Sequence, residues 1–103
     1  MILKILIQNI DFAEIKGSDN EEITSITFDS RKSTPGSLFI AIKGTVTDGH
    51  NFIGKAVENG CRAVVCERLP EVLTQGVTYI VVPDSEKAVA ELAKTFYGDP
   101  SKN

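Results

Sequence analysis

The chain has 103 residues, enough for one domain with a modest core, and its hydrophobic content of 42% and charged content of 24% are ordinary for a globular protein. The formal net charge of −3 argues against a nucleic-acid-binding protein, and the absence of Trp argues against a stacking platform for single strands. No apolar run reaches the ~20 residues that a membrane-spanning helix needs. We therefore expect neither a nucleic acid nor a membrane as a partner.

The only two cysteines, Cys61 and Cys66, lie beside the apolar run at 63–65. The alternation of side chains in a strand is expected to place the two thiols on opposite or diverging faces, as reduced core residues. Reduced thiols fit a cytoplasmic protein. A structural zinc site needs about four ligands, which the single His50 does not complete, so no metal site is expected.

The first half of the chain predicts one helix, one loop and two strands. Apolar residues at helical spacing favour a helix over residues 2–10, with a strand as the alternative. Residues 12–22 contain a loop, and the alternation at 23–28 predicts a short strand near a sheet edge. After a turn at Pro35 and Gly36, the continuous apolar run at 38–42 predicts a strand covered on both faces.

The second half alternates helices with apolar strands. A helix is expected at 51–59, capped by Asp48 or Asn51 and ended at Gly60. Apolar runs at 63–66 and 77–82 predict two more strands, and Asp84 or Ser85 caps a final helix over 84–97. This alternation is typical of a three-layer α/β fold with a mostly parallel or mixed sheet flanked by helices, as a single domain over 1–103.

Two loops of small polar residues bracket the strand at 38–42, and they hold the candidate binding residues. Ser30 offers a hydroxyl, Arg31 a planar guanidinium that suits phosphate, and Thr45 and Thr47 further hydroxyls. The second loop leads into the start of the helix expected near Asn51, where anions are favoured. A nucleoside diphosphate would suit this set of groups.

Each of these residues also has a purely structural interpretation. Asp29 and Ser30 can form a turn, Arg31 can pair with a nearby acid, and Asp48 with Gly49 is an ordinary turn pair. His50 can be a hydrogen-bonding residue of the loop instead of a catalytic base. The sequence holds no Gly-rich phosphate loop followed by Lys and Ser or Thr, and no nucleophile–base pair, so no catalytic residue is expected in this chain.

Three motifs together resemble the N-terminal domain of the Mur ligases, the cytoplasmic ATP-dependent amide ligases that build the peptidoglycan stem peptide. They are Thr-Phe-Asp-Ser-Arg at 27–31, Pro-Gly-Ser-Leu-Phe-Ile-Ala at 35–41 with Lys-Gly at 43–44, and Asp-Gly-His-Asn-Phe-Ile at 48–53. The ending Phe-Tyr-Gly-Asp-Pro-Ser at 96–101 is most similar to the MurE type, which adds the third residue to UDP-MurNAc-L-Ala-D-Glu. The segment at 45–50 resembles the form found in Bacillus-like Gram-positive bacteria.

The resemblance implies that this domain binds the UDP end of a UDP-MurNAc-peptide substrate. Substrate contacts would come from Phe28, Ser30 and the three-residue segment of Thr45, Val46 and Thr47. The resemblance is less specific for four further candidates, which are Arg31, Asp48, Gly49 and His50.

The resemblance also implies that ATP and Mg²⁺ act in central and C-terminal domains that are absent from this chain, which itself would hold no cofactor and be inactive. The added residue, meso-diaminopimelate or L-Lys, would be selected by the C-terminal domain. Two alternatives stay open: the N-terminal domain of a MurF-type ligase, which shares the first two motifs, and a free-standing, non-catalytic α/β module that binds an anion or a nucleotide.

Overall fold

The computed structural model describes residues 1–42 and 49–98, and within them five strands form one sheet. The strands are β1 (Glu14–Lys16), β2 (Ser25–Thr27), β3 (Ser37–Ile40), β4 (Ala63–Cys66) and β5 (Thr78–Val81), in the spatial order β1-β5-β4-β3-β2. Strands β2 to β5 run parallel, whereas β1 pairs antiparallel with β5. The predicted mixed, mostly parallel sheet is confirmed, as is the position of β2 at an edge.

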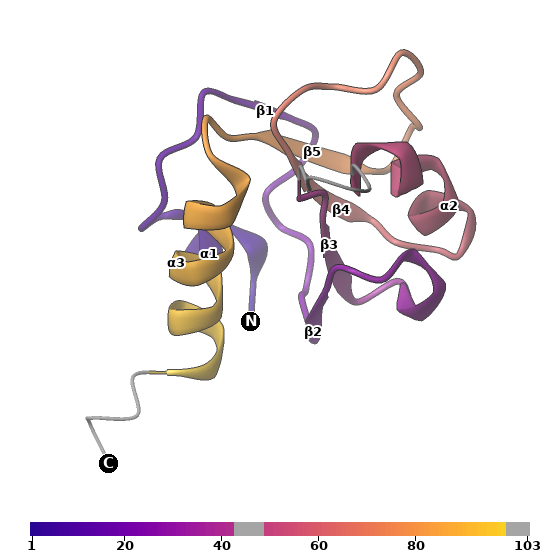
Figure 1. Ribbon diagram of the computed structural model, residues 1–103. Coiled ribbons are helices and arrows are strands. Elements are labelled where there is room, and N and C mark those ends of the chain that lie inside the picture. The colour runs from indigo at the N-terminus through magenta and orange to yellow at the C-terminus, as the bar shows by residue number, and fades with distance from the viewer. Residues whose placement is uncertain (43–48, 99–103) are drawn as a thin grey trace.

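Helices cover both faces of this sheet, so the predicted three layers are confirmed. The helices α1 (Leu3–Ile7) and α3 (Ser85–Tyr97) lie on one side and α2 (Ile53–Glu58) lies on the other (Figure 1). There are also two short 3-10 turns: η1 (Ser30–Lys32) follows β2, and η2 (Gly49–Phe52) directly precedes α2. The helix α2 is the crossover connection between the parallel strands β3 and β4, whereas α1 precedes β1 and α3 follows β5.

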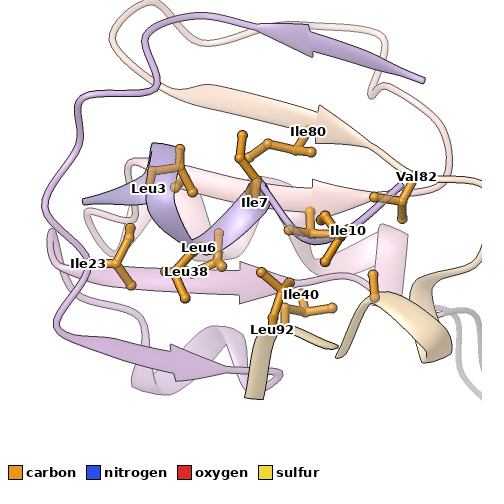
Figure 2. Packing of buried hydrophobic residues seen from close by; sticks show 13 residues of the cluster. Leu3, Leu6, Ile7, Ile10, Ile23, Leu38, Ile40, Ile80, Val82 and Leu92 are labelled. Carbon is orange, nitrogen blue, oxygen red and sulfur yellow. The ribbon is translucent and has the colours of Figure 1, made fainter. Parts of the chain in front are cut away.

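The alternation of side chains along the three central strands divides the core into two clusters. On the side of α1 and α3, residues such as Leu38, Ile40 and Ile80 pack in one cluster with Leu6 and Leu92 (Figure 2). On the side of α2, the core is formed by Phe39, Val64, Tyr79, Ile53 and Ala56. Every residue of β3 and β4 is buried, which is why the sequence of these strands is continuously apolar or small.

Local signals set the helix ends as expected at α3 and at the end of α2. The Asp84 side chain accepts hydrogen bonds from the backbone N–H groups of Glu86 and Lys87, so it is the N-cap of α3. Gly60 follows α2 with φ +104°, the left-handed conformation that glycine adopts most readily. The predicted cap by Asn51 is wrong, because the N-cap of α2 is Phe52 and it makes no side-chain cap bond. Asp48 lies outside the described residues.

Four other expectations need correction. The helix predicted over 2–10 forms only over α1, and the strand predicted at 38–42 ends at Ile40. The segment 12–22 contains β1, which was not predicted because only Ile15 of its three residues is partly buried and its partner β5 is distant in the chain. Cys61 and Cys66 both belong to the cluster beneath α2 and not to diverging faces, since Cys61 precedes β4 and the strand alternation does not extend to it.

Candidate functional site

An open cleft of about 770 Å³ lies where β2 ends and α2 begins. The residues that line it come from two segments of the chain, and they are Phe28, Asp29, Ser30, Arg31, Phe52 and Lys55. The first four follow directly after β2, and the last two belong to η2 and α2. The cleft therefore lies at the carboxyl end of a parallel strand, the usual position of ligands in open α/β sheets.

A set of local hydrogen bonds holds the segment after β2 in place. The Asp29 carboxylate caps η1 by accepting from the Arg31 backbone N–H at 2.9 Å, and Thr27 Oγ1 accepts from the Asp29 N–H at 3.1 Å. At the end of α2, Asn59 Nδ2 donates to the Ser30 carbonyl oxygen at 2.8 Å. Ser30 is thus held through its backbone carbonyl; it is only 6% exposed, and it lines the cleft.

Arg31 and Asp29 form a two-bond ion pair within this wall. Arg31 Nε and Nη2 donate to the two carboxylate oxygens of Asp29 at 3.1 and 3.0 Å. The hydrogen bonds from the Arg31 guanidinium and from its backbone N–H hold the pKa of Asp29 below its usual value, and the hydrogen bond to Asp29 raises the pKa of Arg31. This contact confirms the predicted pairing of Arg31, as a surface cation, with a nearby acidic residue.

The other wall carries Phe52 and Lys55, neither of which we expected in the site. The helix expected over 51–59 would place Phe52 and Ile53 on one helical face, but Phe52 lies in η2 and is 42% exposed, whereas Ile53 is buried. A 3-10 turn advances side chains by a different angle than an α-helix does, so the periodic pattern misplaced it. Lys55 is an exposed lysine that no pattern in the sequence distinguishes from the others.

His50 lies farther along the same sheet edge and serves as a hydrogen-bond acceptor. Its Nε2 accepts from the backbone N–H of Glu67 at 2.8 Å. The Glu67 carboxylate in turn accepts from the backbone N–H and the hydroxyl of Ser85 at 2.9 and 2.8 Å, so it joins the end of β4 to the start of α3. These two hydrogen bonds hold the pKa of Glu67 below its usual value. The geometry agrees with the structural interpretation of His50.

The structure thus brings together three of the candidate residues, Phe28, Ser30 and Arg31, in one cleft. Gly49 is held beside β3 by its N–H, which donates to the Ile42 carbonyl oxygen at 2.8 Å. Four further candidates lie outside the described residues: Thr45, Val46, Thr47 and Asp48. The expectation that this loop faces Ser30 therefore stays a prediction. Within 1–42 and 49–98, no three His, Cys, Asp or Glu residues are grouped as metal ligands.

Comparison with known families settles what kind of chain this is. A family model described as "Mur ligase family, catalytic domain" matches residues 22–97. The chain belongs to the Mur ligase family. This Mur ligase sequence is 54% identical over 101 residues to the UDP-N-acetylmuramoyl-L-alanyl-D-glutamate–2,6-diaminopimelate ligase of Phocaeicola vulgatus, covering 98% of the chain and 21% of that protein. The expected resemblance to the N-terminal domain of a MurE-type Mur ligase is confirmed.

Other relatives with the same name support this assignment. The ligase of Chlorobaculum tepidum is 54% identical over 91 residues, covering 86% of the chain and 18% of that protein. The ligase of Alkaliphilus metalliredigens is 46% identical over 103 residues, covering the whole chain and 21% of that protein. The chain thus spans about a fifth of the length of these relatives. None of the three comes from a Bacillus, so the Bacillus-like form of residues 45–50 stays a prediction.

Solved structures of MurF ligases share the fold. MurF from Acinetobacter baumannii superposes with a TM-score of 0.63 at 34% identity, covering 71% of this chain and 16% of that chain. MurF from Thermotoga maritima in complex with ADP gives a TM-score of 0.59 at 31% identity, covering 72% and 16%. No helix in the described part of the chain is long and apolar enough to cross a membrane.

Proposed function

We propose that this chain is the substrate-binding N-terminal domain of a cytoplasmic MurE-type ligase, and that its cleft holds the UDP part of UDP-MurNAc-L-Ala-D-Glu. The observation that carries the proposal is the convergence of Phe28, Ser30 and Arg31 in one cleft at the end of β2. Relatives named as ligases of this UDP-linked dipeptide match nearly the whole chain, which supports the same substrate. The segment Thr45–Val46–Thr47 would complete the site from the loop after β3.

The contribution of this domain is to bind and orient the substrate. Ser30 is nearly buried and its backbone carbonyl is held by Asn59, so the backbone that carries its hydroxyl is already ordered before a ligand binds. In the complete ligase, ATP with Mg²⁺ would activate the D-Glu carboxylate for attack by the amine of the incoming diamino acid, in the central and C-terminal domains. Contacts to UDP lie far from that carboxylate and act equally in the ground and transition states.

The proposal predicts a change in Michaelis constant with little change in turnover. In the complete ligase, Ser30→Ala should raise the KM for the UDP substrate about fivefold, the equivalent of one hydrogen bond of ~1 kcal/mol. Val46→Asp should raise it more, because the new carboxylate repels the diphosphate. Turnover at saturating substrate should stay near that of the wild type, as expected for uniform binding.

Ser33→Ala is the matched control for Ser30→Ala. Ser33 is also 6% exposed, it does not line the cleft, and its hydroxyl has no hydrogen-bond partner among residues 1–42 and 49–98. Unchanged substrate affinity in both Ser30→Ala and Val46→Asp would refute the site assignment.

A MurF-type ligase is the second candidate, favoured by the solved MurF structures that share the fold. The higher identity to ligases of the diaminopimelate-adding type favours MurE. Assaying the complete enzyme with UDP-MurNAc-dipeptide and a diamino acid, and separately with UDP-MurNAc-tripeptide and D-Ala-D-Ala, distinguishes the two. Activity only in the second assay would overturn the MurE assignment, and the absence of ligase activity in both would favour the non-catalytic module.

A further inference from the structure

We propose that Phe52 and Lys55 form the second half of the nucleotide site: Phe52, with Phe28, packs against the nucleobase, and Lys55 is the cation that meets the diphosphate. The inference rests on the proposed function and adds two residues from η2 and α2 to it. Both line the same cleft as Ser30.

The exposure of two phenylalanines in one cleft is the first observation. Phe28 is 60% exposed and Phe52 is 42% exposed, although burying such a side chain yields about 1.5–3 kcal/mol. The two rings come from different segments and do not contact each other, since the only ring pair within 1–42 and 49–98 is Phe96 with Tyr97. Two separate, solvent-facing rings in an open cleft can pack against a planar, largely apolar group. A nucleobase is such a group.

The arrangement of charges in the cleft is the second observation. The cleft-lining residues that the structure describes include three charged side chains, Asp29, Arg31 and Lys55. Arg31 is held by two hydrogen bonds to Asp29, so these two charges neutralise each other and the guanidinium fork is occupied. Among the described residues that line the cleft, the remaining charge is therefore the ammonium group of Lys55.

Lys55 has only a weak competing contact. Its Nζ lies 3.8 Å from Glu58 Oε2, and both side chains are largely exposed, a kind of ion pair that contributes little. The ammonium group can leave this contact at low cost and turn toward an anion in the cleft. α2 has only six residues, so its dipole is weak, and we assign the contact with the anion to Lys55. The expectation that the start of this helix favours anions stays a prediction.

Calorimetric titration of the complete ligase with UDP and with uridine tests both roles separately. Phe52→Ala should weaken the binding of both ligands by the same factor, about tenfold, because it removes a stacking surface for the base. Lys55→Gln should weaken UDP about fivefold and leave uridine unchanged, and Lys55→Arg should restore UDP binding. Lys55→Gln should also flatten the salt dependence of UDP binding.

Matched controls lie elsewhere on the surface. Phe12 is 41% exposed and does not line the cleft, so Phe12→Ala should leave both affinities unchanged. Lys16 forms an exposed ion pair with Glu14, and Lys16→Gln should leave UDP binding unchanged. If Phe52→Ala fails to fold, Phe52→Leu keeps the apolar bulk without the ring and should still weaken both ligands.

The outcomes separate this inference from the proposed function. If the wild type binds UDP and Ser30→Ala weakens it, while Phe52→Ala and Lys55→Gln stay within about twofold of the wild type, the inference is wrong and the proposed function stands. If the wild type binds neither ligand, the proposed function itself fails. Equal weakening of UDP and uridine by Lys55→Gln would contradict the diphosphate role.

Discussion

Replacing Glu67 tests how strongly one carboxylate joins the sheet to α3. Glu67 follows β4, and its Oε2 accepts two hydrogen bonds from Ser85, the first residue of α3. Ser85 is fully buried, so water does not replace a lost partner. Asp84 caps the same helix through Glu86 and Lys87 and stays in place in a Glu67 variant.

The expected loss of stability follows from these contacts. A hydrogen bond to a charged group contributes about 1.5–3 kcal/mol, and a buried donor without a partner costs about 1–3 kcal/mol. Glu67→Ala removes the acceptor of two donors and should lower the free energy of unfolding by about 3 kcal/mol. Glu67→Gln keeps a neutral acceptor of the same shape and should lower it by about 1 kcal/mol.

The effect should depend on pH in a defined direction. The pKa of Glu67 in the folded protein lies below its usual value of 4.5, so the folded state binds fewer protons than the unfolded state near that pH. The stabilisation is fully present above the unfolded pKa and is lost as the pH falls through the folded pKa. The difference between wild type and Glu67→Gln should therefore shrink between about pH 5 and 3.

Urea unfolding followed by circular dichroism, at neutral pH and across that acidic range, measures this difference. Asp29, whose pKa is also lowered, is present in both proteins, so its contribution cancels. Glu71→Gln, at an exposed loop position, is the control and should match the wild type at every pH. A Glu67→Gln difference that stays constant down to pH 3 would refute the role of the ionised carboxylate.

Two further predictions concern close packing around the sheet. Gly49→Ala should lower the free energy of unfolding by more than ~1 kcal/mol in urea titrations, because its Cβ would lie 2.7 and 2.8 Å from backbone atoms of Ile42. Gly54→Ala, with open space around the new Cβ, should not destabilise, and equal losses in both variants would contradict the reasoning. Burial raises the pKa of Cys61 and of Cys66, the latter to about 11, so both thiols should react with a disulfide reagent much faster in urea than in native buffer. A thiol that reacts in native buffer as fast as in urea would contradict this.

The sequence alone determined the elements whose signals are local. The apolar runs of β3, β4 and β5 are continuous because these strands are buried on both faces, and that composition is visible without a structure. The cap of α3 depends on N–H groups within three residues, so the sequence narrowed it to Asp84 or Ser85, and the structure shows that it is Asp84. The family motifs likewise located Phe28, Ser30 and Arg31, which follow one strand and share one cleft.

Only the tertiary structure decided the features that depend on partners distant in the chain. The strand β1 exists because β5 offers it a free edge, some sixty residues away in the sequence. The exposure of Phe52 depends on a 3-10 turn in place of the first helical turn, and Lys55 enters the site because α2 packs beside η1. Hydrogen bonds join His50 to Glu67 and Glu67 to Ser85. These residues come from three segments of the chain, and no periodic pattern in the sequence predicts that the segments meet. Periodicity reports which face of an element is buried, but which elements meet there is set by packing.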